Sequence, residues 1–312
     1  MNEESRAIDA LKDIALESLK EQKRTRRWGI FFKLFFVAYL LATLYLIFSP
    51  MKGSDTDSLT ATEITALVDV KGVIMDGSEA SADMVVGSLR NAFKHEKTKG
   101  VIIRINSPGG SPVQSGYIND EIRRLKAEYE DIPVYAVVSD VCASGGYYIA
   151  VAADEIYADK ASIVGSIGVR MDSFGAVELM KKVGVERRLY TAGTNKGMLD
   201  PFMPEVPEQV SHIDKMLDVT HQQFINVVKE GRGDRLKGGS EVFSGLFWTG
   251  ESAVELGLVD GLGSTSYVAR EIIGAEHIKN FTAEKDLIQR LSDRISTSIS
   301  MMMRSETTPR TV

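Results

Sequence analysis

The chain has 312 residues, of which 44% are hydrophobic and 26% charged, and this composition indicates a globular protein with one large domain or two small ones. Its net charge is −6, and the residues after position 33 carry 29 Lys and Arg against 37 Asp and Glu, which argues against nucleic acid as the main partner. The single cysteine, Cys142, excludes an intramolecular disulfide, and the four histidines lack the close spacings of a zinc site, so we expect no metal and no other cofactor.

Residues 28–48 form an apolar run, WGIFFKLFFVAYLLATLYLIF, whose single charge is Lys33 near one end. A run of 21 residues is long enough to cross a bilayer as a helix, and a lysine near its end can reach the headgroups. A helix buried in the protein core is one alternative, but this aromatic-rich run is too continuous for an amphipathic helix. A cleaved signal peptide is another, but the residues that follow lack an A-x-A-like site. We therefore expect one uncleaved transmembrane anchor over residues 28–49.

Basic residues crowd the amino-terminal side of this run. Five Lys and Arg lie within residues 20–27, whereas the far side opens with Lys52 followed by a polar stretch. The positive-inside rule then places residues 1–27 in the cytoplasm and everything after residue 50 outside. One face of residues 1–27 has apolar side chains at helical spacing, which fits a solvated helical extension, a partner-facing helix or an interfacial helix. These side chains are Ile8, Leu11, Ala15 and Leu19.

From residue 64 to residue 285, short apolar strands alternate with helical patterns. We expect strands in 63–74, 100–106, 133–140, 155–159 and 187–193, a strand or turn in 162–169, and helices in 81–94, 111–130, 145–153, 174–185 and 208–232. This alternation is typical of an α/β domain of repeated β-α crossover units, with helices covering a mostly parallel sheet. A polar linker, residues 50–63, precedes the domain. Residues 286–312 follow it, with a C-terminal helix indicated by Leu287, Leu291, Ile295 and Ile299 and then a flexible tail.

Three loops that follow predicted strands carry residues suited to acyl transfer. Residues 106–111, NSPGGS, contain two glycines whose amides can face an anion, although this loop taken alone fits an ordinary strand-to-helix turn better. Ser144, in VCASGGYY, begins a helix, where unpaired amides favour a developing negative charge, although serine is also a common N-cap. Lys196, in TAGTNKGMLDPF, lies on a glycine-rich loop. A desolvated lysine can accept a serine proton, whereas most loop lysines are only solvated.

Histidines do not occur on these loops. His212 and His221 fall among charged residues of the predicted helix 208–232, where we expect them on the surface. Asn106 and Asp140 flank the predicted site, and turn or capping roles suit them better than catalysis. From the residues alone, a Ser-Lys pair is therefore one hypothesis among several.

Six segments, taken in this order, resemble the signal peptide peptidase A family of membrane-anchored serine proteases, which has a ClpP/crotonase-like fold. They are RINSPGGS (104–111), ASGGYYIA (143–150), GSIGV (165–169), KGMLDPF (196–202), FINVVKEGRG (224–233) and WTGESAVELGLVDGLG (248–263). Together they cover most of residues 65–270. Each motif alone is weak, but the order of the loops and the apolar anchor agree with the family.

The resemblance implies a role for each matching residue. Ser144 would be the nucleophile, Lys196 the general base and later the general acid, and Ser166 would orient the lysine amine. Gly110 and Gly145 would present the oxyanion-hole amides, with Gly109 as the alternative to Gly110.

The resemblance also implies an oligomeric assembly, a class of substrates and a cellular location. The family forms homo-oligomers with sites between neighbours, so Lys196 would reach Ser144 of an adjacent subunit. The substrates would be apolar signal peptides left in the membrane, or other membrane and exported polypeptides. The protein would be anchored by a single pass in a bacterial inner (cytoplasmic) membrane, with its N-terminus cytoplasmic and the protease domain, residues 64–285, extracytoplasmic.

Two other functions compete with the protease interpretation. A crotonase-like acyl-CoA enzyme would also use paired backbone amides, but it has little use for an anchor with its domain outside the cell. A catalytically silent scaffold that binds membrane peptides would be expected to lose the serine or the lysine, and the chain has both.

Overall fold

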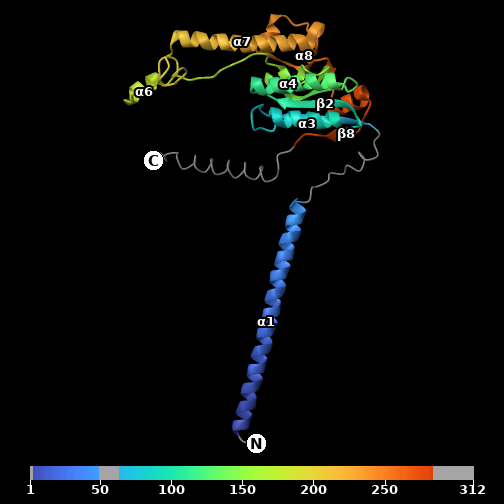
Figure 1. Cartoon of the computed structure of the whole chain (residues 1–312), viewed down its shortest axis with the longest axis vertical. Helices are drawn as coiled ribbons and strands as arrows, with labels where there is room; N and C mark the ends of the chain where they lie inside the picture. Colours follow the sequence, from blue (N-terminus) through green and yellow to red (C-terminus); the bar gives the residue numbers. More distant parts are fainter. Residues whose placement is uncertain (1–2, 49–62, 284–312) are drawn as a thin grey trace. The chain divides into compact units, whose positions relative to one another are not determined.

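The computed structural model describes residues 3–48 and 63–283, which belong to two compact units, Met1–Thr56 and Asp57–Val312. The predicted linker, apart from Glu63, and the predicted C-terminal segment 286–312 lie outside the described residues. The first unit contains one continuous helix, α1 (Glu3–Phe48), drawn in blue in Figure 1. It includes the predicted helical segment and the predicted membrane anchor.

Helix α1 exposes large apolar side chains along the predicted anchor. Phe31, Phe35 and Leu41 are each more than half exposed. Among the residues that the structure describes, no helix has the length and hydropathy needed to cross a membrane. The side chains of Leu44 and of residues 46–48, which are the far end of the predicted anchor, are not described. The anchor therefore stays a prediction.

The second unit is built on one mixed sheet of eight strands. Its main path runs β6 (Phe247–Thr249), β5 (Ile163–Gly165), β3 (Val134–Ala143), β2 (Thr98–Ser107), β1 (Ile64–Lys71) and β8 (Ile278–Asn280). Off this path, β4 (Glu155–Ala158) pairs with β3 and with β7 (Gly261–Leu262). Every pairing is parallel except that of β5 with β6. The expected α/β domain with a mostly parallel sheet is thus confirmed.

Helices α3 (Ala82–Lys94), α4 (Pro112–Glu128) and α5 (Gly145–Ala150) share one hydrophobic core with the central strands. In α3, the apolar residues Val85, Leu89, Ala92 and Phe93 recur at three- and four-residue spacing and are buried. Helix α4 begins where Ser111 Oγ accepts a hydrogen bond from the Gln114 amide at 3.3 Å, with Pro112 in the first turn. The local sequence therefore explains both the start and the buried face of these helices.

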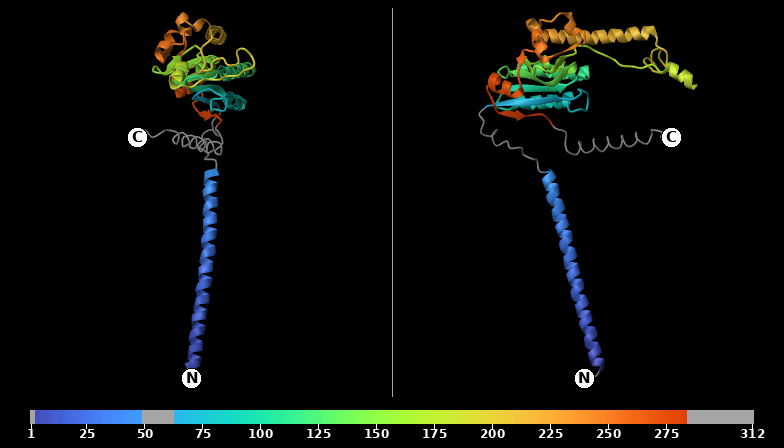
Figure 2. Two further views of the ribbon diagram at one scale, coloured as in Figure 1. Left: turned by 90° about the vertical axis from the view of Figure 1, so that its left-hand side faces the viewer. Right: turned by 180° about the vertical axis from the view of Figure 1, so that it is seen from behind.

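The remaining helical elements complete the unit. A smaller core joins β1, β2, β3 and β4 to η3 (Val268–Ile273), a π-helical segment. The other elements are α6 (Val177–Val183), α7 (Pro207–Arg232), η1 (Gly233–Arg235), η2 (Ser240–Phe243), α8 (Gly250–Glu255) and α9 (Thr265–Tyr267). Helix α7 runs past α4 on the side away from α3 (Figure 1, Figure 2).

Strand β3 changes its neighbour along its length. It pairs with β4 over residues 135–137 and with β5 over residues 141–143. Between these stretches Asn106 Nδ2 donates to Asp140 Oδ2 at 2.7 Å, and the Val141 amide donates to Asn106 Oδ1 at 3.3 Å. Asn106 and Asp140 thus stabilise an irregular stretch of the β2–β3 ladder, and this directs the end of β3 toward β5.

The predicted strand 187–193 is wrong. Within the described residues this segment pairs with no strand, and it belongs to a stretch between β5 and α7 that extends beyond the sheet, with α6 at its tip (Figure 1, Figure 2). Its residues favour β structure, but the edge of β5 is already occupied by β6. Tyr190 is accordingly 89% exposed. Apolar pattern alone predicted the strand, and the lack of a pairing edge prevents it.

A buried ion pair attaches the end of α7 to the turn before β7. Arg232, 2% exposed, donates from both guanidinium NH2 groups to the two carboxylate oxygens of Asp260, at 2.7 and 2.9 Å, and from Nε to the Gly257 carbonyl at 2.8 Å. Burial alone would raise the pKa of Asp260, but the hydrogen bonds and charge of Arg232 outweigh it and hold this pKa below its ordinary value. The Ile156 amide also donates to Asp260, at 2.7 Å.

We expect Asp260→Asn to lower the free energy of unfolding by about 3 to 5 kcal/mol, because it leaves the buried Arg232 charge without its partner. Since the folded pKa of Asp260 is lowered, its contribution is present above the ordinary carboxyl range and is lost as pH falls through the folded value. Urea unfolding at pH 7 and along an acid series measures both effects. The exposed Asp234→Asn is the control, and equal effects of the two substitutions would contradict the assignment.

Candidate active site

Ser144 occupies a strained turn between β3 and α5. Its backbone angles are φ 51° and ψ −122°, a region that residues other than glycine rarely adopt. The turn is fixed on both sides, because the Ser144 amide donates to the Gly165 carbonyl at 2.8 Å and the Ser144 carbonyl accepts from the Tyr148 amide at 2.9 Å. The side chain is half-buried. The backbone therefore sets the position of the Ser144 hydroxyl.

The loop between β2 and α4 lies directly against this turn. A Cβ on Gly109 would lie 2.7 Å from Ser144 Cβ, and Gly109 has φ 100°. A Cβ on Gly110 would lie 2.0 Å from the Ile74 carbonyl oxygen. Ile74 holds the loop through its amide, which donates to the Gly109 carbonyl at 2.9 Å, and through its carbonyl, which accepts from the Ser111 amide at 2.7 Å. Only glycine allows this close approach of the loop to Ser144.

Two backbone amides beside Ser144 have no acceptor. The Gly109 amide donates to Ser107 Oγ at 3.1 Å. In contrast, the amides of Gly110 and Gly145 donate to no acceptor within residues 3–48 and 63–283. The Gly110 nitrogen lies 3.2 Å from the point that a Cβ on Gly145 would occupy, so the two glycines are adjacent. Adjacent free amides next to a serine hydroxyl can stabilise a negatively charged oxygen.

Ser166 lies on the segment that contacts Ser144 from the other side. It has φ 53°, and its amide donates to the Leu246 carbonyl at 2.7 Å. The preceding residue, Gly165, packs against the Trp248 ring, since a Cβ there would lie 2.9 Å from the ring. Strand β6 therefore supports the site, a role that the motif around Trp248 did not reveal from sequence.

Lys196 is not joined to this group within the chain. It is exposed, and its amide donates to the Gly193 carbonyl at 3.1 Å. It borders a shallow hollow whose lining residues all lie within 187–202. Among the described residues, no hydrogen bond links Lys196 to Ser144 or Ser166. The structure thus brings Ser144, Gly109, Gly110 and Gly145 together and leaves Lys196 on the extended stretch.

His221 is half-buried, so its expected place on the surface is wrong. Its Nε2 lies 3.2 Å from the Ile167 carbonyl oxygen, next to Ser166 in the chain. His212, on the same helix, is exposed as expected. The signal for this difference was present in the sequence, because His221 shares a helix face with Phe224, Val228 and Arg232, which are buried.

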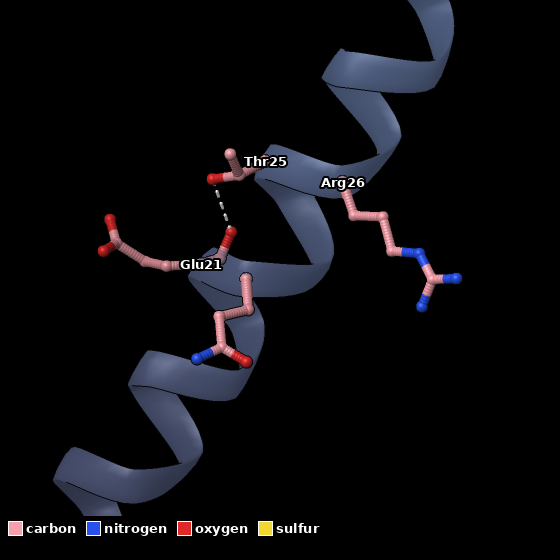
Figure 3. Close-up of a pocket in the computed structure, with 4 residues that line it drawn as sticks. Glu21, Thr25 and Arg26 are labelled. Atoms are coloured by element: carbon pink, nitrogen blue, oxygen red, sulfur yellow. Dashed lines mark hydrogen bonds between the residues drawn. The ribbon is translucent and has the colours of Figure 1, made fainter.

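Neither the hollow on α1 nor Cys142 offers a competing catalytic site. A hollow beside Glu21, Thr25 and Arg26 follows the surface of the single helix α1 (Figure 3), where Thr25 Oγ1 donates to the Glu21 carbonyl at 2.9 Å. No group of His, Cys, Asp and Glu in residues 3–48 and 63–283 is arranged to hold a metal ion. Cys142 is fully buried, and burial raises the pKa of its thiol, so it is unsuited to nucleophilic chemistry.

Comparison with known protein families shows a match over about half of the chain. The model for peptidase family S49 matches residues 126–279, a range that contains Ser144, Ser166 and Lys196 but not Gly109 or Gly110.

The relatives that match this chain differ in the share of their own length that the chain covers. The Na(+)/H(+) antiporter NhaA of Brucella melitensis is 49% identical over 213 residues, which is 67% of this chain but only 29% of that protein. The putative protease slr0021 of Synechocystis is 34% identical over 199 residues, 64% of this chain and 69% of the relative. The putative signal peptide peptidase SppA of Enterococcus faecium is 32% identical over 204 residues, 63% and 59% of the two chains.

Among solved structures, a mutant of the 1510-N membrane-bound stomatin-specific protease in complex with a substrate peptide covers 76% of this chain and 99% of that one. It has 15% identity and a TM-score of 0.44, a likeness too low to carry a structural argument.

The close packing of the glycine loop predicts opposite effects for two substitutions. Gly109→Ala should destabilise the protein by about 1 to 3 kcal/mol, because its Cβ overlaps Ser144 and its φ is positive. Gly116→Ala, on α4 with nothing within 4 Å of the new Cβ, should stabilise it by about 0.5 to 1 kcal/mol. Urea unfolding measures both. A neutral Gly109→Ala would contradict the close approach.

Proposed function

The chain belongs to peptidase family S49, and we propose that it is a serine endopeptidase with Ser144 as its nucleophile and Lys196 as its general base. The observation that carries this proposal is the placement of Ser144 in a strained turn beside two amides without acceptors. An acyl-transfer site needs a positioned nucleophile and donors for the developing oxyanion, and this turn would supply both. The order of β-α units further supports a ClpP/crotonase-like fold.

In this proposal Ser144 Oγ attacks the scissile carbonyl carbon while its proton passes to the neutral amine of Lys196. The carbonyl oxygen becomes negatively charged and accepts hydrogen bonds from the Gly110 and Gly145 amides. We assign Gly110 in preference to Gly109, because the Gly109 amide already donates to Ser107. The lysine ammonium then donates its proton to the leaving amine, which breaks the peptide bond and leaves an acyl ester on Ser144. Water, deprotonated by the lysine, hydrolyses that ester.

We assign Ser166 to hold the lysine amine. Its backbone is next to the Ser144 turn, because the Gly165 carbonyl accepts the Ser144 amide hydrogen at 2.8 Å. Its left-handed φ is maintained by the bond from its amide to Leu246. A serine hydroxyl at this place can accept a hydrogen bond from a lysine that approaches Ser144.

We further propose that Lys196 acts on Ser144 of a second copy of the chain, so that the enzyme is a homo-oligomer. The extended stretch that carries Lys196 has no packing partner for several of its apolar side chains. Leu179, Val183 and Tyr190 are 63%, 62% and 89% exposed. Contact with a second copy would bury these side chains and complete the dyad.

Apolar peptides suit this site as substrates, and we propose cleaved signal peptides and other membrane or exported polypeptides. Val73 and Met75 flank Ile74, which holds the glycine loop, and each is 52% exposed. They offer an apolar surface beside the oxyanion amides. The resemblance to signal peptide peptidases supports the same substrate class.

We place the enzyme in a bacterial inner membrane, anchored by residues 28–48 with the N-terminus in the cytoplasm. This assignment rests on the length of the apolar run, the continuous helix α1 and the basic residues before Trp28. The protease domain would then lie outside the cytoplasm, where signal peptides left in the membrane can reach it.

Ser144→Ala and Lys196→Ala should each lower kcat/KM for an apolar peptide by at least about a thousandfold, because each removes one member of the dyad. A mixture of the two variants should recover activity, since mixed oligomers contain sites with both native residues. Lys94→Ala, an exposed lysine on α3, is the control. Cleavage of a fluorogenic peptide by the full chain in detergent measures all four samples.

Normal activity of Lys196→Ala would overturn the assignment of the base. A wild-type oligomer that cleaves no peptide would favour the silent scaffold. If both variants are inactive and their confirmed mixed oligomers are inactive too, the dyad lies within one chain.

Deletion of residues 1–53 should release the protein from membranes. The full chain is expected in the membrane pellet after alkaline carbonate extraction, because a single span of apolar side chains is retained by the bilayer. Deletion of residues 1–19, which leaves the apolar run intact, is the control. Recovery of the full chain in the supernatant would contradict the anchor.

A further inference from the structure

We propose that His221 is a positioning residue that fixes Ser166 through the neighbouring Ile167 carbonyl. This inference rests on the proposed Ser-Lys function, within which Ser166 holds the lysine amine. His221 itself is assigned no contact with substrate and no proton transfer. Its effect is transmitted by one hydrogen bond from its side chain to the backbone of the segment beside Ser144.

Helix α7 is held firmly enough to act as a support. Its last turn is joined to the turn before β7 by Arg232 and Asp260. Two residues earlier, Glu230 accepts a hydrogen bond from Arg123 of α4 at 2.5 Å. The rings of Phe224 and Tyr148 pack in a tilted arrangement with their centroids 5.1 Å apart, and the Tyr148 amide bonds to the Ser144 carbonyl. His221 is three residues before Phe224 on the same face, and it therefore faces the domain.

Residues 165–167 need support on both sides of Ser166. Ser166 has φ 53°, a conformation that persists only where the surroundings impose it. On the amino-terminal side, the Gly165 carbonyl accepts from Ser144, and the Ser166 amide donates to Leu246. On the other side, Ile167 is fully buried, and its carbonyl is bonded to His221. Among the described residues, His221 supplies the one side-chain hydrogen bond to the backbone of this segment.

The chemistry of the bond fits a fixed support. The Ile167 carbonyl can only accept, so His221 Nε2 must carry the hydrogen. That hydrogen is present in one neutral tautomer and in the imidazolium form, so the bond does not require a change of charge. A side chain without a donor would leave this carbonyl unpaired and allow Ser166 to move. A displacement of about 1 Å at a catalytic group can cost about a hundredfold in rate.

The test compares His221→Leu, His221→Gln and His212→Leu in the full chain. Leucine removes the donor, glutamine keeps an N–H at similar reach, and His212 is an exposed residue of the same helix. We expect His221→Leu to lower kcat about 10- to 100-fold with KM within about twofold of wild type. Glutamine should restore kcat to within about threefold, and His212→Leu should have no effect.

Two further readouts separate positioning from general stability. In a double-mutant cycle, His221→Leu should lower kcat little further in a Ser166→Ala background, because it acts through Ser166. Hydrogen exchange measured by mass spectrometry should be about tenfold faster for the Ser166 amide in His221→Leu and unchanged in His221→Gln. The exchange measurement does not depend on activity.

Additive losses in the cycle, or unchanged exchange in His221→Leu, would overturn the proposal. If His221→Gln is as inactive as Ser144→Ala while Lys196→Ala is active, His221 is the base and the proposed dyad fails. If wild type cleaves no peptide, the proposed function fails, and the exchange measurement still decides whether His221 fixes this segment.

Discussion

The close approach of the Gly109–Gly110 backbone to Ser144 is the constraint on which the rest of the site depends. A side chain on Gly109 would overlap Ser144, and one on Gly110 would overlap the Ile74 carbonyl. Within the part of the chain that the structure describes, the approach leaves the Gly110 and Gly145 amides without acceptors beside a serine whose backbone is strained. Strain and unpaired polar groups both lower stability, so a fold keeps them where they serve chemistry. Strands β2 and β3 fix the two sides of this arrangement because they are neighbours in the sheet.

Residues 165–167, which lie beside Ser144 on the side away from the glycine loop, are held by elements far away in the chain. Gly165 packs on Trp248 of β6, Ser166 bonds to Leu246, and His221 of α7 bonds to Ile167. Helix α7 is in turn anchored by the buried pair of Arg232 and Asp260. A surface helix and an edge strand thus determine the geometry beside Ser144.

Local patterns predicted most of the fold. The alternation of apolar strands and helices was confirmed from β1 to α5, because the elements of this stretch bury side chains in one core. The strand predicted at 187–193 failed, since strand formation also needs a free edge, and β6 covers the edge of β5. His221 was predicted on the surface because its neighbours in the sequence are charged, although it shares a helix face with the buried Phe224. The position of Lys196 relative to Ser144 was beyond prediction, since within the described chain no contact joins them.

The proposal that Ser144 is the activated serine is tested most directly by reaction with a fluorophosphonate. Mass spectrometry of the digested full chain then identifies the serine that has reacted. Such a reagent phosphonylates a serine that is activated by a base and faces an oxyanion hole. We predict one adduct, on the peptide that contains Ser144, formed at least about a hundredfold more slowly in Lys196→Ala. An adduct on another serine with Ser144 unmodified, or no adduct on the assembled protein, would contradict it.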